Sequence, residues 1–436
     1  MTEVLQVLDQ QLPSYSPSRS PPSYTPQALA GEATLAQTSR FHSISTSHPT
    51  GTFTKHVGEI SITLSEQDQD VDIPSYGRHG VLSGNINLDP SIKVEDIIEV
   101  VFKVEGRIKL TISSSNTVSK TIKVINEQYD LWSCKASHFD LSGSTTACPM
   151  NIPFSTVLPT TFKFKDGDRE FPLPPSYEVN FTGMPGLYAK CTYAICGIVK
   201  IHGSLWDHKK IVSTPFIYRP RTHPRQPIVT TSFLSSVKSL PEEWFQATSL
   251  LKPRPGTNPS LGSLNVNFFL PAVRTFGLRD SIPYHIQISG SISSLKEFHS
   301  NVQYNLDSES LSSSPLRSRS NNLTLTMSVS LRRQVRVDVK SQSVRKGSLI
   351  GTGTLNAVAP PIELDPTLHS LQEMTLDWEG TVRCRPEICV GHFDARNLSA
   401  TDFLMFSIQP KTTHRVFDPL QIIVPISLVT DTWVEH

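Results

Sequence analysis

The sequence predicts an all-β protein of two β-sandwiches in tandem, preceded by a tail that does not fold by itself. Short runs rich in Val and Ile alternate apolar with polar residues, and Gly, Pro, Ser and Asn separate them. The first half of the chain shows no helical period over three turns. With 436 residues, 37% of them hydrophobic, the chain is long enough for two or three domains with real cores.

Residues 1–52 form the predicted disordered tail. Ser, Thr, Pro and Gln dominate this segment, and no hydrophobic period is sustained in it. Before Lys55 the only charged residues are Glu3, Asp9, Arg19, Glu32 and Arg40. A segment of this composition cannot bury enough apolar surface to offset the entropy lost on folding.

Two sets of strand-like runs follow the tail. The first sandwich, residues 53–218, has runs at 56–64, 80–88, 97–112, 121–131, 161–164, 176–182, 187–202 and 211–218. A basic, proline-rich linker is expected at 219–227 because it has few apolar side chains to bury. The second sandwich, residues 228–436, has runs at 261–270, 281–289, 323–340, 348–355, 373–384, 403–409 and 420–429. A Ser-rich insertion at about 306–322 is expected to be mobile.

The tail carries two copies of a proline–tyrosine motif, here called PY motifs. Their key residues are Leu12, Pro13 and Tyr15 in one copy and Pro21, Pro22 and Tyr24 in the other. Prolines hold the backbone near polyproline II and the tyrosine supplies an aromatic anchor, which suits the groove of a WW domain. Two copies raise the effective concentration for a partner with several WW domains. The alternative is that Pro, Ser and Tyr simply recur in disordered tails.

Two further tyrosine motifs lie in the predicted sandwiches. The segment Pro174-Pro-Ser-Tyr177 matches the ligand pattern, but it opens a predicted strand in which Tyr177 alternates with Val179 and Phe181. We expect it to be structural, because proline is tolerated at the start of a strand. The segment Ile73-Pro-Ser-Tyr76 has only one proline and is a weaker second candidate.

No sequence pattern indicates an enzyme, and no catalytic residue, metal ligand or cofactor is assigned. The histidines are scattered, and neither a Gly-x-Ser-x-Gly nor a Gly-x-x-x-x-Gly-Lys motif occurs. Two cysteine pairs with four intervening residues, Cys191 with Cys196 and Cys384 with Cys389, could in principle form a zinc site. We favour ordinary thiols, because Cys191 and Cys196 would point to opposite faces of one strand.

The run from Leu331 to Lys340 carries the most distinctive local charge. As a strand it would place Leu331, Arg333 and the valines on one face, and Arg332, Arg336 and Lys340 on the other. A solvated outer face is the default interpretation. The alternative is a docking patch for phosphorylated cargo tails or lipid head groups, to which Arg219, Arg221 and Arg225 could add if they lie close. The net charge of +1 favours neither nucleic acid nor membranes.

Several serines are candidate phosphorylation sites. Ser16, Ser20 and Ser314 precede prolines, whereas Ser43 and Ser320 suit kinases that select basic residues. Phosphate beside Tyr15 or Tyr24 would add charge next to an apolar groove, so we expect it to weaken WW binding.

The order of landmarks after the tail resembles that of the arrestin superfamily, particularly fungal α-arrestin-like proteins (arrestin-related trafficking adaptors). The landmarks are Gly80-Val-Leu-Ser-Gly84, Ile152-Pro-Phe154, Leu173-Pro-Pro-Ser-Tyr177, Gly186-Leu-Tyr-Ala-Lys-Cys-Thr-Tyr193, Tyr218-Arg-Pro-Arg221, Arg279-Asp-Ser-Ile-Pro-Tyr284 and Val424-Pro-Ile-Ser-Leu-Val-Thr-Asp431. The resemblance implies arrestin N and C domains, each an immunoglobulin-like β-sandwich. It also implies an adaptor that recruits a HECT-type ubiquitin ligase through PY motifs.

The sequence and the resemblance together favour a non-enzymatic adaptor. Its expected partners are a WW-domain HECT-type ubiquitin ligase, ubiquitin, and the cytosolic tails of membrane transporters or receptors, whose endocytosis and sorting it would promote. No run is long enough to span a membrane and no signal peptide is indicated, so we expect a cytoplasmic protein recruited to the plasma membrane or endosomes. The alternatives are a trafficking scaffold that recruits no ligase and a carrier of lipids or small molecules.

Overall fold

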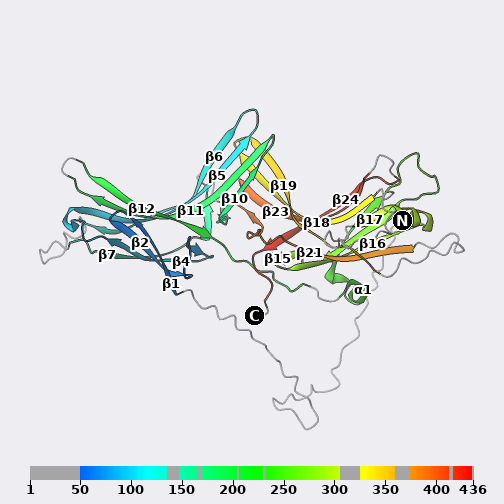
Figure 1. Ribbon diagram of the computed structural model, residues 1–436, viewed down its shortest axis with the longest axis horizontal. Helices are drawn as coiled ribbons and strands as arrows, with labels where there is room; N and C mark the ends of the chain where they lie inside the picture. Colours follow the sequence, from blue (N-terminus) through cyan, green and yellow to red (C-terminus); the bar gives the residue numbers. More distant parts are fainter. Residues whose placement is uncertain are drawn as a thin grey trace, which may run out of the picture. The chain divides into compact units, whose positions relative to one another are not determined.

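The computed structural model describes residues 50–134, 147–164, 169–203, 206–228, 232–304, 325–358, 374–411 and 416–434. In this part of the chain the protein is almost entirely β-structure, which confirms the predicted fold class (Figure 1). Residues 49–436 belong to one compact unit. None of the helices in the described ranges has the length and apolarity that crossing a bilayer requires.

The first sandwich has two layers, antiparallel except for the parallel pairing of β3 with β12, and a small accessory sheet. One layer has the order β1-β2-β4-β7 and comprises β1 (Gly51–Val57), β2 (Ile60–Gln67), β4 (Val81–Leu88) and β7 (Asn151–Val157). The other has the order β3-β12-β11-β5-β6, with β10 also paired to β11. Its strands are β3 (Ser75–Tyr76), β5 (Ile97–Ser113), β6 (Val118–Ser133), β10 (Tyr177–Phe181), β11 (Gly186–Ile201) and β12 (His208–Tyr218). The accessory sheet pairs β8 (Thr161–Lys163) with β9 (Glu170–Pro172).

The second sandwich repeats the two-layer plan. One layer comprises β13 (Trp244–Leu251), β14 (Leu264–Pro271), β16 (Ser281–Gly290), β21 (Met374–Arg383) and β20 (Asn356–Val358) in that spatial order. The other has the order β15-β24-β23-β18-β17, with β19 paired to β18 and β22 to β23. Its strands are β15 (Thr275–Gly277), β17 (Val302–Tyr304), β18 (Leu325–Val339), β19 (Gln342–Thr352), β22 (Phe393–Asp394), β23 (Leu398–Pro410) and β24 (Leu420–Val429).

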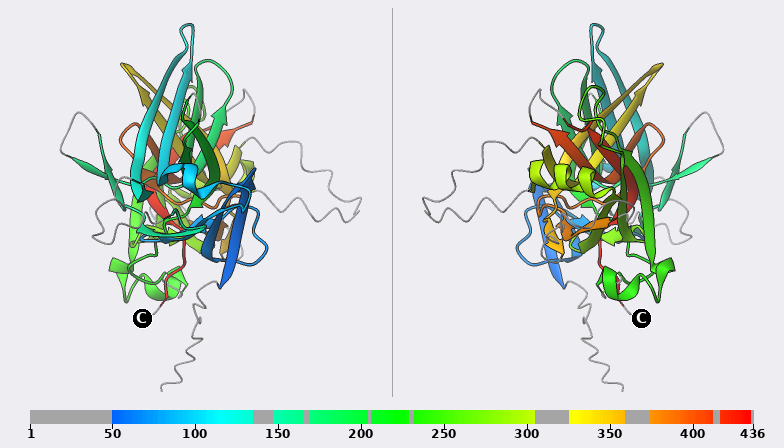
Figure 2. Two further views of the ribbon diagram at one scale, coloured as in Figure 1. Left: turned by 90° about the vertical axis from the view of Figure 1, so that its left-hand side faces the viewer. Right: turned by 90° about the vertical axis from the view of Figure 1, so that its right-hand side faces the viewer.

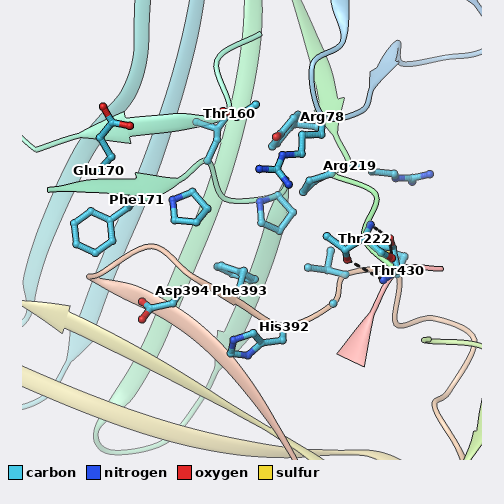
Figure 3. Close-up of a pocket in the computed structure, with 18 of the residues that line it drawn as sticks. Arg78, Thr160, Glu170, Phe171, Arg219, Thr222, His392, Phe393, Asp394 and Thr430 are labelled. Atoms are coloured by element: carbon cyan, nitrogen blue, oxygen red, sulfur yellow. Dashed lines mark hydrogen bonds between the residues drawn. The ribbon is translucent and has the colours of Figure 1, made fainter. Parts of the chain in front are cut away.

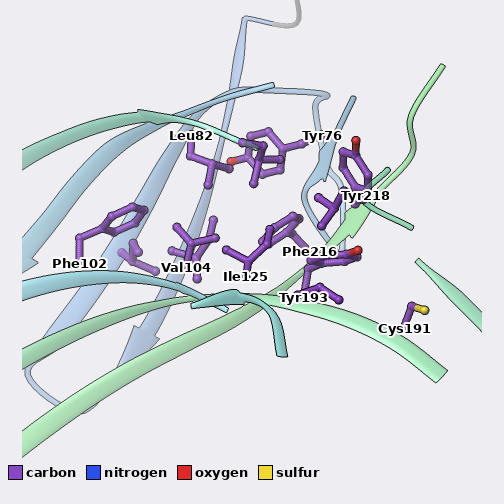
Figure 4. Close-up of a cluster of buried hydrophobic side chains, with 14 of the residues drawn as sticks. Tyr76, Leu82, Phe102, Val104, Ile125, Cys191, Tyr193, Phe216 and Tyr218 are labelled. Carbon is purple, nitrogen blue, oxygen red and sulfur yellow. The ribbon is translucent and has the colours of Figure 1, made fainter. Parts of the chain in front are cut away.

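Each sandwich buries its own apolar interior. In the first core, Phe102 stacks on Phe154 with ring centroids 4.1 Å apart, and a group of aromatic rings that includes Tyr193, Phe216 and Tyr218 fills the other end (Figure 4). In the second core, Phe268 stacks on Phe406 with centroids 5.8 Å apart. Burial of these alternate residues is the main force that holds each pair of sheets together.

Two neighbouring strands, β18 and β23, contribute to both cores. The inner face of β18 contributes Leu325, Met327, Val329 and Leu331 to the second core, and then Val335, Val337 and Val339 to the first core. Strand β23 makes the same change: Leu404, Phe406 and Ile408 belong to the second core, and Leu398 belongs to the first. The long strands of the two sandwiches therefore pack against each other through apolar side chains, and we call this contact the junction.

The sequence-based runs coincide with most of the long strands, but they differ from the structure in several places. The predicted run at 56–64 is a hairpin of β1 and β2, because Gly58 adopts a positive φ of 59° and reverses the chain. Strands β7 and β13 and the short strands β3, β9, β15, β17, β20 and β22 were not predicted as runs. The helices α1 (Phe233–Ser236) and α2 (Ile292–Asn301), and the 3-10 turns Val94–Asp96 and Pro241–Glu243, were also missed.

Helix α2, yellow-green in Figure 2, has 10 residues. It is shorter than the three turns over which a helical period was sought in the sequence. Its signal is nevertheless present. Ser291 caps the helix by accepting a hydrogen bond from the Ser294 backbone N–H, and Leu295 and Phe298 are buried at a spacing of three. The cap and this pair together could have identified the helix.

The predicted linker at 219–227 is attached at both ends. The backbone N–H of Arg219 donates to the Tyr76 carbonyl in the first sandwich. Arg221 forms a two-pronged ion pair with Asp431, at 2.9 and 3.1 Å, just after β24 of the second sandwich. Thr222 and Thr430 add hydrogen bonds beside it. The segment is therefore bound to both sandwiches by hydrogen bonds and an ion pair, and it is not a free spacer.

A first prediction concerns Gly106 in β5. A Cβ atom at this position would lie 2.7 Å from the buried Tyr193 ring and 2.9 Å from a Val124 methyl group. We expect Gly106→Ala to lower the free energy of unfolding by about 1–3 kcal/mol, because the core has no room to relax. The control is Gly77→Ala, whose Cβ would have its nearest neighbour at 3.8 Å. Urea unfolding of both variants measures the difference, and equal midpoints would contradict the packing described here.

Candidate functional site

Most of the predicted ligand and modification sites lie outside the described residues. This applies to both tail PY motifs, with Leu12, Pro13, Tyr15, Pro21, Pro22 and Tyr24, and to the serines Ser16, Ser20, Ser43, Ser314 and Ser320. The Ser-rich insertion at 306–322 also lies outside them. The folded body instead provides the proline–tyrosine segments near Tyr76 and Tyr177, the basic strand β18, and the junction.

The segment Pro174-Pro-Ser-Tyr177 is part of the first sandwich. The Pro174 carbonyl accepts a hydrogen bond from the Tyr193 hydroxyl, and Ser176 bonds to Tyr218 through both its backbone and its side chain. The Tyr177 ring meets Phe393 of the second sandwich edge-on, with centroids 5.3 Å apart. Burial raises the pKa of the Tyr177 hydroxyl to about 12. A WW domain could bind this tyrosine only after β10 had separated from β11.

The weaker candidate, Tyr76, is also buried in the folded protein. Its side chain is 6% exposed and its ring packs edge-on against Phe216, with centroids 5.4 Å apart. Strand β3 pairs in parallel with β12, which fixes the backbone of the motif as well. Tyr76 therefore cannot act as an accessible ligand while the first sandwich is folded, and the interpretation of residues 73–76 as a secondary site is wrong for the folded state.

Strand β18 has the alternation that the sequence predicts. Residues 331, 333, 335, 337 and 339 are buried, whereas Arg332 and Lys340 are exposed and Arg336 is half-buried. Arg336 is already engaged: its Nε lies 3.3 Å from a carboxylate oxygen of Asp338, and its Nη2 donates to the Arg396 carbonyl. Lys340 lies in the β18–β19 turn with a positive φ of 55°. Of the three predicted docking residues, Arg332 and Lys340 are exposed to a ligand, whereas Arg336 already contacts other groups of the protein.

Arg332 borders a hollow on the outer face of the second sandwich. The hollow has a volume of about 510 Å³, and its walls include Leu349, Met405 and the hydroxyl groups of Ser328, Ser330 and Ser407. Cross-strand pairing explains this set, since Arg332 lies opposite Leu349, Ser330 opposite Met405 and Ser328 opposite Ser407. Arg221 does not contribute, because it is bound to Asp431. The hollow offers one cation, hydroxyl donors and apolar surface.

A buried ion pair marks the point where β18 and β23 pass from one core to the other. Arg333 donates to both carboxylate oxygens of Asp402, at 2.7 and 3.0 Å, and its third nitrogen donates to the Val390 carbonyl at 2.7 Å. The two residues are 4% and 1% exposed. Burial by itself lowers the pKa of Arg333, but the hydrogen bond and charge of Asp402 outweigh it and hold the pKa above its usual value. The arginine therefore stays charged.

Sequence reasoning placed Arg333 on the apolar face but missed its partner. The signal was a single charge among Leu331, Val335 and Val337 on the same face. A buried guanidinium requires an acceptor, so the pattern implies a carboxylate nearby. Asp402 occupies the directly opposite position on β23. Strand register, and not sequence spacing, identifies it.

A cavity of about 440 Å³ lies at the junction, next to the Tyr177–Phe393 contact. Its walls come from both sandwiches: Figure 3 shows Arg78 and Phe171 on one side, and His392 and Phe393 on the other. Two carboxylates, Glu170 and Asp394, also line it. The lining therefore combines prolines, aromatic rings and charges of both signs.

The cysteines are free thiols in the structure. Cys191 is buried in the first core, whereas Cys196 lies on the opposite face of β11 and its thiol contacts the Ser213 hydroxyl. Burial raises the pKa of Cys191 to about 12 and that of Cys384 to about 11, so both are poor nucleophiles at neutral pH. Within the described ranges, no group of three or more metal-ligating side chains lies together.

Comparisons with known proteins add no family assignment. No protein-family model matches the chain, and a search of curated proteins found no match. Functional conclusions therefore depend on the sequence motifs and the geometry described above.

The Arg333–Asp402 pair yields a second prediction. Replacing Arg333 by Met leaves the Asp402 carboxylate buried without its partner, so we expect the free energy of unfolding to fall by about 3–5 kcal/mol. The double variant Arg333→Met/Asp402→Leu removes both charges and is expected to recover most of this loss. Chemical denaturation of the two variants measures the effect. A double variant as unstable as the single one would show that the pair does more than neutralise a buried charge.

Proposed function

We propose that this chain is a non-enzymatic adaptor of the arrestin-like type. Its PY motifs at Tyr15 and Tyr24 recruit a WW-domain HECT-type ubiquitin ligase, and its β-sandwich body holds the cytosolic tail of a membrane transporter or receptor. Ubiquitin is then transferred to the cargo or to the adaptor, which promotes endocytosis and sorting. The protein works from the cytoplasm and is recruited to the plasma membrane or endosomes.

The main support for this proposal is that the fold makes the two proline–tyrosine segments of the body inaccessible. Tyr76 is buried in the first core. The backbone of Tyr177 pairs with β11, and its ring packs against Phe393. A WW domain needs an exposed polyproline II backbone and an accessible ring. Neither body segment offers these without local unfolding, so the two tail copies remain as the ligands. Their proximity in sequence, with Tyr15 and Tyr24 nine residues apart, suits a partner with tandem WW domains.

The third prediction tests ligase recruitment. Full-length protein should bind a tandem WW-domain fragment, and Tyr15→Ala/Tyr24→Ala should abolish binding because both aromatic anchors are lost. Each single variant should bind more weakly than the wild type, since the gain from two linked sites disappears. Titration at fixed salt measures the affinities.

The matched control is Tyr177→Phe, which keeps the ring against Phe393 and removes only the hydroxyl. This variant should bind WW domains as the wild type does. If the wild type itself fails to bind, the ligase-recruiting role is wrong and a trafficking scaffold without ubiquitin chemistry takes its place. Binding that persists in the tail double variant would identify a body tyrosine as the ligand.

We further propose that Arg332, with Arg336 and Lys340 farther along the chain, docks a phosphorylated cargo tail. The hollow that Arg332 borders supports this role, because an extended peptide could place apolar side chains against Met405 and a phosphate on the guanidinium. Asp338 offsets part of the charge of Arg336, so Arg332 is the principal residue of the three.

The fourth prediction tests this docking residue. A library of phosphoserine peptides should contain sequences that the protein binds more tightly than their unphosphorylated counterparts, and Arg332→Glu should weaken that binding about tenfold or more. The control is Lys238→Glu, which makes the same charge change at an exposed lysine elsewhere in the second half of the chain. Equal losses in both variants would mean that only net charge matters, and the hollow would lose its role.

A further inference from the structure

A basic surface covers the outer face of the long strands of the first sandwich. Its members are Lys103, Arg107 and Lys109 on β5, Lys123 on β6 and Lys190 on β11, and we call it the basic face. The opposite face of the same strands belongs to the first core, where Ile108, Leu110 and Ile112 are buried. The alternation of the strands therefore fixes these cations on the solvent side.

Strand register places like charges directly opposite one another within the basic face. Lys109 pairs with Lys190 across β5 and β11, and Arg107 pairs with Lys123 across β5 and β6. Like charges in directly opposed positions destabilise a sheet. Two such pairs lie two residues apart along β5, and one member of each, Lys109 or Lys123, has no ion-pair partner among the described residues. Their presence calls for a reason other than stability.

Nearby carboxylates do not cancel this charge. Glu105 pairs with Lys103 and Arg107, and Glu178 pairs with Lys190 at 2.8 Å. Lys109 and Lys123 are exposed and have no ion-pair partner among the described residues. The five cations of the basic face thus meet only two carboxylates, and the excess positive charge is spread over three adjacent strands.

Apolar and aromatic side chains lie at one end of the same surface. The β10–β11 turn exposes Met184, whose exposed fraction is 77%. Tyr188 follows on the same face of β11 as Lys190, and its hydroxyl donates to Glu178 at 3.2 Å. These side chains suit the successive layers of a bilayer surface. The exposed methionine suits the boundary of the acyl chains, the aromatic ring suits the head-group region, and the cations suit the anionic surface.

We propose that the basic face is a docking surface for a membrane that contains anionic lipid. A two-dimensional array of head groups matches cations distributed both along and across three strands, whereas an extended acidic peptide would contact a single line of them. Each lysine or arginine near an anionic membrane contributes about 1 kcal/mol of attraction, and salt weakens it. The surface lies on the first sandwich, whereas Arg332 lies on β18 of the second, and it holds the body against the membrane in which cargo resides.

The fifth prediction tests this surface with the full-length protein and vesicles. Wild type should sediment with vesicles that contain phosphatidylserine and not with phosphatidylcholine alone, and added salt should reverse binding. Lys109→Gln/Lys123→Gln should lower the partition coefficient about 25-fold, which is roughly fivefold for each cation removed. Its thermal midpoint should equal or exceed that of the wild type, because the substitutions relieve cross-strand repulsion.

The control is Lys55→Gln/Lys93→Gln, which removes the same net charge from exposed lysines of the same sandwich outside the basic face. This variant should bind phosphatidylserine vesicles like the wild type. Equal losses in both double variants would overturn the proposal. So would a wild type that ignores the vesicles but binds polyglutamate through Lys109 and Lys123, since the surface would then take an acidic protein segment. The test uses neither WW domains nor cargo, so its failure leaves the adaptor proposal untouched.

Discussion

The organisation of this protein depends on the inner face of β18, which serves two hydrophobic cores in succession. Residues up to Leu331 fill the second core, residues from Val335 onward fill the first, and Arg333 occupies the change-over. The ion pair with Asp402 makes a charge tolerable at that point, because both carboxylate oxygens and a backbone carbonyl accept its hydrogen bonds. The two sandwiches are therefore joined by shared apolar packing, and the linker adds the Arg221–Asp431 pair.

This junction also decides which parts of the chain are left for partners. Packing of Tyr177 against Phe393 and burial of Tyr76 remove two proline–tyrosine segments from the accessible surface. The outer faces of the packed strands then become the available body surfaces. One carries Arg332 and its hollow, and the other carries the basic face. In the proposed adaptor, recruitment belongs to the tail, and attachment to cargo and membrane belongs to these faces.

Charge placement separates the structural ion pairs from the interaction surfaces. Arg333 and Arg221 are paired and contribute to how the sandwiches are held. Arg332, Lys109 and Lys123 are exposed, and the last two lie beside other cations across the strands. Pairing that satisfies a charge suits a structural role, whereas unpaired like charges on a sheet face cost stability and suit an anionic partner.

The sequence by itself determined the β class, most strand positions and which residues of β18 share a face, because period-two alternation is a local property. It also identified the tail motifs, whose recognition needs only a short peptide. Tertiary structure alone decided the partner of Arg333, which lies 69 residues away, the burial of Tyr76 and the fastening of Tyr177. It alone assembled the basic face, since Arg107 meets Lys123, and Lys109 meets Lys190, only through strand register. Local alternation determines the face of the strand on which a residue lies. Pairing with strands that are distant in the sequence determines which side chains are its neighbours on that face.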